Sequence, residues 1–463
     1  MNAINVTYLP IKIAFIALSL STSSASLAEE VDSFWNQQGD NLSAILKQQA
    51  AYGTHSSSSH KKQSQQPGWQ QNEWQLDIEY NEAIDTGILS GDIMAIARGR
   101  FDFPQALENE SGNTLRIREL YWQTYTDNSF WRLGKQQVVW GEADGLKLLD
   151  VINPQDFREF ILDDFDDSRI PIWMMNAQIN TSDSGMLQLL LIPDTSTHEL
   201  AENDSIYQFT SPVVVPSMTN ETLSSLGINE LVIQQENDAK SGDAGLRYSD
   251  FISLQDSSWD ITLNYLHHYI DTPVVSTSID NDTLVVDLQY KASHLIGASA
   301  STVLGNVSIR SEIAYETDRY QRSEVSLEAL NIILPNIVKG NLFSSVIGLD
   351  YQGLSDNFIS VQWYRQTLLL NKNEHQKAIA DRDEDRLTLL WETKFLNETI
   401  TTRWQHIHGV NHGDGILRPK VTYNWQSNID VYLGADYFYG KTEDFFGQFN
   451  KTDRIVAGFT IGL

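Results

Sequence analysis

Residues 387–395 read LTLLWETKF. Four of the five odd positions, beginning with Leu387 and ending with Phe395, carry apolar side chains, and three of the four even positions carry polar ones. Successive side chains of a strand point to opposite faces, so this alternation separates the apolar residues from the polar ones. The stretch therefore predicts a β-strand with one apolar face and one polar face.

The same alternation recurs along most of the chain, for example in 74–80, 259–265 and 429–437. It predicts 17 strands, near 73–82, 92–103, 113–125, 129–140, 171–180, 185–193, 241–252, 257–270, 282–303, 306–317, 341–352, 356–368, 386–397, 398–409, 416–426, 428–438 and 453–463. A closed barrel with both ends on one side needs an even number. We therefore expect 16 to 18 strands, with 18 preferred, the missing one lying in 282–303 or in the polar segment 29–72.

The N-terminal sequence predicts export. Residues 1–28 have the layout of a signal peptide: Lys12, an apolar run, and small residues ending at Ala28. The chain has no cysteine, so neither a lipid anchor on a thiol nor a disulfide can form. After residue 28 no apolar run approaches the roughly 20 residues of a membrane helix. The other structure that satisfies its backbone in lipid is a closed barrel.

We therefore expect an all-β fold, a transmembrane antiparallel up-and-down β-barrel in the outer membrane, in contact with outer-membrane lipid. Residues 29–72 are expected to be a flexible segment or a plug, and residues 73–463 the barrel. Short turns are expected to alternate with long loops, as between the periplasmic and extracellular edges of such barrels. The long loops are expected at 141–170, 194–240, 318–340, 369–385 and 439–452.

The C-terminus supports the same interpretation. Ile455, Ala457, Phe459, Ile461 and Leu463 alternate to the last residue. The stretch 458–463 resembles the signal that barrel-assembly machinery reads, although an aromatic residue is more usual than leucine at its end. We therefore expect that machinery to be a partner.

Charge and motifs exclude several functions. The chain has 61 acidic and 32 basic residues and a formal charge of −29, which excludes nucleic acid as an expected partner. No HExxH, GxSxG, GxGxxG or phosphate-loop pattern occurs, so we expect no enzyme and no cofactor. His406 and His408, with His412 nearby, could bind a metal, but surface histidines without such a role are commoner. We assign no metal ligand.

The connection after residue 140 combines charge with apolar residues. Its acids include Glu142, Asp144, Asp150, Asp156, Asp163, Asp164, Asp166 and Asp167, and its last cation is Arg169. Apolar residues such as Leu148, Leu149 and Phe160 have no place in a loop surrounded by water. We expect this acidic segment to fold into the barrel lumen.

The neighbouring strands carry arginines at strand spacing, Arg98, Arg100, Arg116, Arg118 and Arg132. Facing lipid, each would cost roughly 2 to 4 kcal/mol at the membrane midplane, so they are expected to face inward as a basic ladder. Together with the acidic segment they are the candidate constriction. Two interpretations remain open: the charges form a transverse field that filters solutes, or they only hold the segment in place.

Residues 133–173, LGKQQVVWGEADGLKLLDVINPQDFREFILDDFDDSRIPIW, carry a family resemblance. The run from Gly134 to Trp173 resembles the signature of the Gram-negative outer-membrane proteins catalogued as domain of unknown function 1302. The resemblance covers about 60 residues, from Phe130 to Pro193, and implies a β-barrel without naming a substrate.

Three functional classes remain open after the sequence. The first is a porin-like channel for small solutes. The second is an outer-membrane component for export of lipid or hydrophobic compounds, working with an export partner, which would need a lateral opening or an apolar lumen. The third is a surface enzyme such as a glycosidase, which would need a cleft with two carboxylates at catalytic separation.

Overall fold

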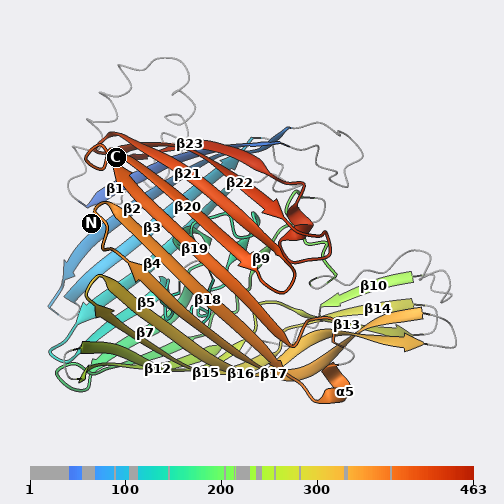
Figure 1. Ribbon diagram of the computed structural model, residues 1–463. Helices are drawn as coiled ribbons and strands as arrows, with labels where there is room; N and C mark the ends of the chain where they lie inside the picture. The colour runs from blue at the N-terminus through green and yellow to red at the C-terminus, as the bar shows by residue number, and fades with distance from the viewer. Residues whose placement is uncertain are drawn as a thin grey trace, which may run out of the picture.

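The computed structural model describes residues 41–54, 68–87, 90–103, 113–143, 146–202, 205–212, 214, 230–235, 242–254, 257–280, 283–327, 332–375 and 378–463. Its main feature is one sheet of 18 strands that closes on itself (Figure 1). The strands are β1 (Leu42–Gly53), β2 (Trp69–Asp85), β3 (Ser90–Asp102), β4 (Thr114–Tyr125), β5 (Ser129–Gln136), β7 (Ile172–Asn180), β8 (Met186–Ile192), β11 (Asp243–Leu254), β12 (Ser257–Tyr269), β15 (Ala292–Leu304), β16 (Val307–Leu327), β17 (Ile332–Tyr351), β18 (Asn357–Leu369), β19 (Asp383–Phe395), β20 (Ile400–Gly409), β21 (Asp414–Gln426), β22 (Ile429–Tyr439) and β23 (Arg454–Gly462).

Each barrel strand pairs antiparallel with the barrel strands before and after it in the chain, and β23 pairs with β1 to close the ring. The predicted class, an antiparallel up-and-down barrel of 18 strands, is confirmed. No helix in the described residues is long and apolar enough to cross a membrane.

Two small sheets are not part of this ring. β10 (Glu230–Gln235), β14 (Thr283–Gln289) and β13 (Val274–Asp280) form a three-stranded sheet beside the far end of β17 (Figure 1). β6 (Asp156–Phe157) pairs in parallel with β9 (Glu199–Leu200). The short helices are α3 (Phe165–Ser168), α5 (Lys372–His375) and the 3-10 helix η3 (Gly447–Phe449).

The strand missing from the sequence prediction is β1. The interpretation of 29–72 as a flexible segment or plug is therefore wrong for 42–53 and for 69–72, which are barrel strands. The pattern is broken there because Gln48 lies in register between Trp74 and Phe459, on the face where an apolar residue is expected. The expected signal peptide, residues 29–40 and residues 55–67 lie outside the described part of the chain.

Two other boundaries also differ from the prediction. The stretch 282–303 does contain two strands, but only β15 belongs to the barrel. The expected long loop 318–340 is instead largely strand, because β16 and β17 continue to pair after a register shift at Glu316 and Arg319. This long hairpin projects beyond the barrel next to the three-stranded sheet (Figure 1).

The two edges of the barrel differ in their connections. We call the edge where β1 begins and β23 ends the terminal edge, and the opposite edge the loop edge. Turns at the terminal edge are short, as at 126–128, 305–306 and 427–428. The connections 137–171 and 193–242 both start from the loop edge. In outer-membrane barrels the short turns are periplasmic, so the loop edge corresponds to the extracellular side.

The outer surface of the barrel is apolar. Large exposed side chains point outward from strands on all sides, among them Leu263, Ile296, Ile347, Trp363, Leu389, Trp391 and Leu433. Inward neighbours on the same strands are polar and buried, such as Thr262, Gln362 and Thr388. This arrangement matches the lipid-facing band of an outer-membrane barrel. It explains why apolar and polar residues alternate along the strands in the sequence.

Candidate functional site: the segment inside the barrel

The connection from β5 to β7, residues 137–171, runs through the barrel interior. Trp140, Leu148 and Leu149 are buried and belong to one apolar cluster with inward side chains of the wall, including Leu190 of β8 and Leu266 of β12. Fully burying a side chain of this kind contributes about 1.5 to 3 kcal/mol. The apolar residues that looked out of place in a loop are therefore the ones that attach it to the wall.

A second apolar cluster holds the other end of the segment. Phe160 and Leu162 pack with Tyr207, with wall residues of β20 to β22 and with the loop before β23, where Phe449 lies 4.6 Å from Phe160 between ring centroids. Phe160 has a φ of 58°, a left-handed conformation that a bulky residue adopts only when its surroundings enforce it. Five phenylalanine rings lie around it. The segment is thus attached to two sides of the barrel.

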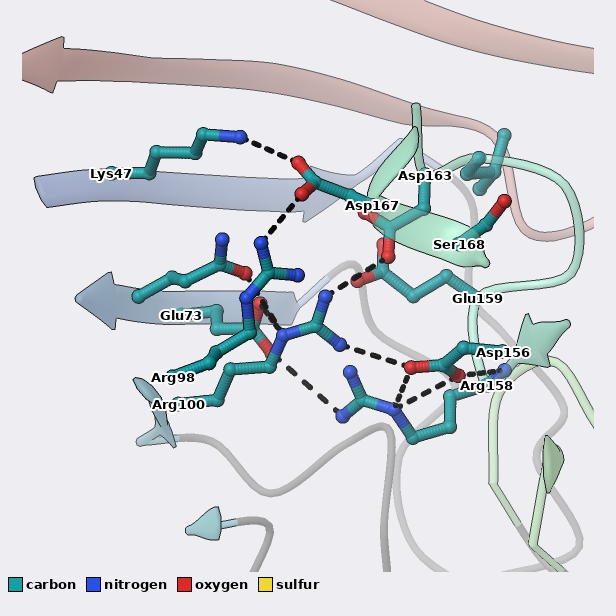
Figure 2. A network of polar contacts seen from close by, with 12 residues as sticks. Lys47, Glu73, Arg98, Arg100, Asp156, Arg158, Glu159, Asp163, Asp167 and Ser168 are labelled. Carbon is teal, nitrogen blue, oxygen red and sulfur yellow. Dashed lines mark hydrogen bonds and ion pairs between the residues drawn. The ribbon is translucent and has the colours of Figure 1, made fainter. Parts of the chain in front are cut away.

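Ion pairs join the segment to β1, β2 and β3 (Figure 2). Arg98 binds Asp77 through two hydrogen bonds of 2.6 and 2.7 Å and reaches Asp167 at 2.7 Å. Lys47 of β1 binds the other oxygen of Asp167 at 2.5 Å. Arg98 and Asp77 are buried, so removing one partner would leave the other as an uncompensated buried charge at high cost.

Arg100 makes the second half of this network. Its guanidinium lies 3.0 Å from Asp156 and 3.4 Å from Asp163 (Figure 2). Because Arg100 is buried, bulk water does not screen these two ion pairs. Arg158 shares Asp156 at 3.0 Å. Although burial acts to raise the pKa of Asp156, Arg158 and Arg100 hold it below its usual value. Asp156 is therefore a fixed anion between two cations.

Glu159 is held by the last strand of the barrel. Its carboxylate lies 3.1 Å from Arg454 of β23 and accepts a hydrogen bond from Gln71 at 2.5 Å. Arg454 also binds Asp436 at 2.7 Å. Burial raises the pKa of Glu159 to about 7 in spite of Arg454. The segment is thus tied to β1, β2, β3 and β23, four consecutive strands around the closure of the ring.

The other predicted arginines do not share one environment. Arg116 is half exposed and pairs with Glu199 at 2.5 Å. Arg118 donates to the backbone carbonyls of Asp166 and Asp167. Arg132 binds Gln123 of β4 and lies over the Tyr121 ring, 4.4 Å from its centroid. The predicted inward-facing ladder is therefore not one uniform row, because these arginines have different partners and different exposure.

The remaining predicted acids are largely structural. Asp150 pairs with Arg169 at 2.8 Å, and Asp166 pairs with Arg169 as well. Glu142 contributes its backbone: its N–H and that of Ala143 donate to Glu312 of β16. Its carbonyl accepts from Arg310. Asp144 lies outside the described residues. Asp164 instead lines the open cavity described next.

A cavity of about 140 Å³ separates the tip of the segment from the opposite wall. The tip contributes residues 161 and 163–165, and the wall contributes basic residues of β20 and β21: Arg403, Arg418 and Lys420. Arg418 is fixed by Asp436 at 2.9 Å and by the Leu162 carbonyl at 2.6 Å. Lys420 lies over the Tyr432 ring, 4.2 Å from its centroid.

The sequence analysis missed these three cations. The signal was present, since Arg418 and Lys420 show the same spacing of two as Arg98 and Arg100. Arg403 pairs in register with Lys420, so the two face the same side of the sheet. Within the described residues no carboxylate lies within ion-pair distance of Arg403 or Lys420. The cations at this cavity therefore belong to β20–β21, which also contact Phe160 and Leu162 of the segment, and not to β3–β4, where the sequence analysis placed the basic residues.

Other candidates from the sequence have different surroundings. His406 and His408 both hydrogen-bond the hydroxyl of Tyr439, at 2.7 and 2.9 Å. No group of three or more metal-ligating side chains was found among the residues that the structure describes.

Comparison with known proteins agrees with the fold. OccAB2 of Acinetobacter baumannii is 10% identical, with a TM-score of 0.50, over 92% of this chain and 98% of that chain. OpdK, an outer membrane protein of Pseudomonas aeruginosa, is 8% identical, with a TM-score of 0.49, over 91% and 98%. OccK2 of Pseudomonas aeruginosa, solved in complex with glucuronate, is 10% identical, with a TM-score of 0.47, over 91% and 97%. No curated protein matches.

The first of these likenesses shows that the fold is that of a porin-like outer-membrane barrel. A family model matches residues 18–460, nearly the whole chain, and so extends the resemblance first noted between Phe130 and Pro193. The chain belongs to the family described as protein of unknown function DUF1302.

Proposed function

We propose that the protein is a porin-like channel for small polar solutes and that the cavity between the segment tip and β20–β21 is its constriction. The observation that carries this proposal is the charge arrangement: Asp163 and Asp164 lie on one side of the cavity, and Arg403 and Lys420 on the other. Opposite charges across a narrow aqueous gap produce a transverse field, which acts most strongly where little water screens it.

The two interpretations left open by the sequence apply to different residues. Arg98 and Arg100 are buried and paired, so they hold the segment in place. Arg403 and Lys420 have no described carboxylate within ion-pair distance, so their charges remain directed at solutes in the cavity. Arg418 connects the two functions, because its bond to the Leu162 carbonyl fixes the distance between tip and wall.

The test is a selectivity measurement on the purified protein in planar lipid bilayers. We expect discrete conductance steps. Replacing Arg403→Gln together with Lys420→Gln removes two positive charges from the constriction, so the reversal potential in a salt gradient should shift toward cation selectivity. The shift should shrink as the ionic strength rises from 0.1 M to 1 M, because the Debye length falls from about 10 Å to about 3 Å.

The control is Lys394→Gln. Lys394 is an exposed cation near the terminal edge that pairs with Glu398 at 3.1 Å and does not line the cavity. This variant should keep the selectivity of the unmodified protein. Absence of conductance steps from correctly folded protein would contradict the channel proposal. Unchanged selectivity in the double variant would contradict the placement of the constriction.

The alternative function, export of lipid or hydrophobic compounds, would require a lateral opening or an apolar lumen, and the lining of the cavity at the segment tip bears on the second of these. The proposed constriction combines apolar residues such as Ile161 with charged ones, among them Asp164, Arg403 and Lys420. This lining favours polar solutes over apolar ones, because stripping charged side chains of water to admit an apolar molecule is costly.

A further inference from the structure

Three neighbouring strands of the barrel, β5, β7 and β8, are short, so the wall that they form is lower than elsewhere along the membrane normal. β5, β7 and β8 contain 8, 9 and 7 residues, at or below the roughly 9 to 11 that a membrane strand needs. β4 pairs with β5 only from Leu120 to Tyr125. The preceding stretch, 114–119, pairs with β3 on one side, and among the described residues no strand pairs with it on the other. We call this place the wall opening.

A basic cavity lies at the wall opening. It measures about 180 Å³ and is lined by more cations than anions. The cations are Arg98, Arg100, Arg116, Arg118, Lys135, Arg158 and Arg169, and the anions are Asp156, Asp167 and Glu199. This cavity is separate from the proposed constriction, because the two share no lining residue.

Two of these cations have only backbone partners within hydrogen-bond distance. Arg118 donates to the carbonyls of Asp166 and Asp167. Lys135 donates to the carbonyl of Ile117 at 3.0 Å, at the strand edge that β5 does not reach. In the part of the chain that the structure describes, no carboxylate lies within ion-pair distance of either cation. An anion arriving at the cavity would therefore find two positive charges that no carboxylate neutralises directly.

Lys135 lies on the lipid-facing side of the wall. It pairs in register with Trp173, which is 47% exposed, and it is two residues from the outward Leu133 on the same strand. A lysine on this face destabilises the barrel in lipid, most strongly at the membrane midplane and less near the interface. A negatively charged group at the same height would compensate for that cost.

The outer border of the wall opening is apolar. Leu115 is 75% exposed and Ile117 is 55% exposed, both on the stretch of β4 without a neighbour. An acyl chain could lie on these residues while its headgroup reaches Lys135 and Arg118. The charge of the cavity and the apolar border thus fit two parts of one molecule.

We propose that the wall opening between β4 and β5 is a lateral binding site for an anionic amphiphile of the surrounding membrane, with a carboxylate or phosphate headgroup. The headgroup enters the basic cavity from the lipid side and the acyl chain stays on Leu115 and Ile117. This site is independent of the proposed channel function, and its test does not measure conductance.

The absence of cysteine makes the test direct. A single Leu133→Cys variant, folded in detergent, carries a fluorophore on the outer surface of β5 next to Lys135. Stearic acid with a nitroxide on its chain is the probe, and its methyl ester is the neutral comparison. We expect the acid to quench the fluorophore at concentrations at least tenfold lower than the ester. A fluorophore at Leu389→Cys, on the outer surface of β19, should not distinguish the two.

Lys135→Gln combined with Arg118→Gln should abolish the preference for the acid, while Lys394→Gln should keep it. The double variant and the Lys394→Gln control must both migrate faster unheated than boiled, as a folded barrel does. If the double variant does not fold, the single variant Lys135→Gln replaces it in the experiment. Equal quenching by acid and ester, or an unchanged preference in the folded variant, would overturn the proposal. If inorganic phosphate at matched concentration displaced the probe, the cavity would bind a soluble anion, and the proposal that its ligand is a membrane amphiphile would be overturned.

Discussion

Arg98 shows how a single residue decides the position of the inserted segment. It is buried and joins Asp77 on the wall to Asp167 in the segment, where Lys47 is the second cation on Asp167. Arg116 of β4 pairs in register with Arg98, but its side chain is half exposed and its ion-pair partner is Glu199. The two arginines looked equivalent in the sequence because spacing reveals the face of a strand but not what lies opposite that face.

We predict that Arg98→Gln loosens the segment. Removing one partner of a buried ion pair leaves an uncompensated charge and typically costs about 3 to 5 kcal/mol. The variant should show frequent current fluctuations in single-channel records and a lower unfolding temperature than the unmodified protein.

Arg116→Gln is the matched control, since an exposed pair contributes about 0 to 1 kcal/mol. It should leave current noise and unfolding temperature nearly unchanged. Equal effects of the two substitutions would show that Arg98 does not hold the segment.

At the scale of elements, the segment 137–171 should narrow the pore without supporting the wall. Each of its described contacts to the wall involves a side chain of the segment or of the wall, whereas the ring is held by strand pairing that does not include residues 143–168. We predict that replacing 143–168 by a short glycine–serine linker gives a folded barrel with higher single-channel conductance. A correctly folded variant with unchanged conductance would place the segment outside the path of ions.

The elements that could be predicted are those with a clear alternation. β19 and β22 follow from their sequences because lipid on one side and water on the other impose a period of two. β1 could not be found in the same way, since Gln48 breaks the outward face and Lys47 serves an ion pair with Asp167. The ends of β16 and β17 were missed because beyond the membrane no lipid imposes the pattern.

The candidate site was predicted only in part. The apolar residues of the acidic segment indicated an interior position because they have no partners in water. Which wall lies opposite the tip could not be derived, since Arg403 and Lys420 are more than 200 residues from Asp164 in sequence. Their approach depends on the curvature of the whole ring, which no local pattern contains.

At the scale of the whole molecule, closure of the sheet makes the fold resistant to detergent, because a closed ring has no unpaired edge. We predict that the protein migrates faster in mild detergent gels when unheated than after boiling, and that it remains with the outer-membrane fraction. Identical migration together with recovery as a soluble periplasmic protein would contradict the barrel in the membrane.

The closure between β1 and β23 also has a kinetic consequence. Ile45 pairs with Gly462, so this contact joins the two ends of the chain and has the largest sequence separation in the ring. Contacts of such separation form late in folding, because a long loop must close first. Lys47 and Arg454, which bind Asp167 and Glu159, lie on these two strands. A partly assembled barrel therefore lacks two of the contacts that fix the segment, and the pore acquires its final width only when the last pair of strands has joined.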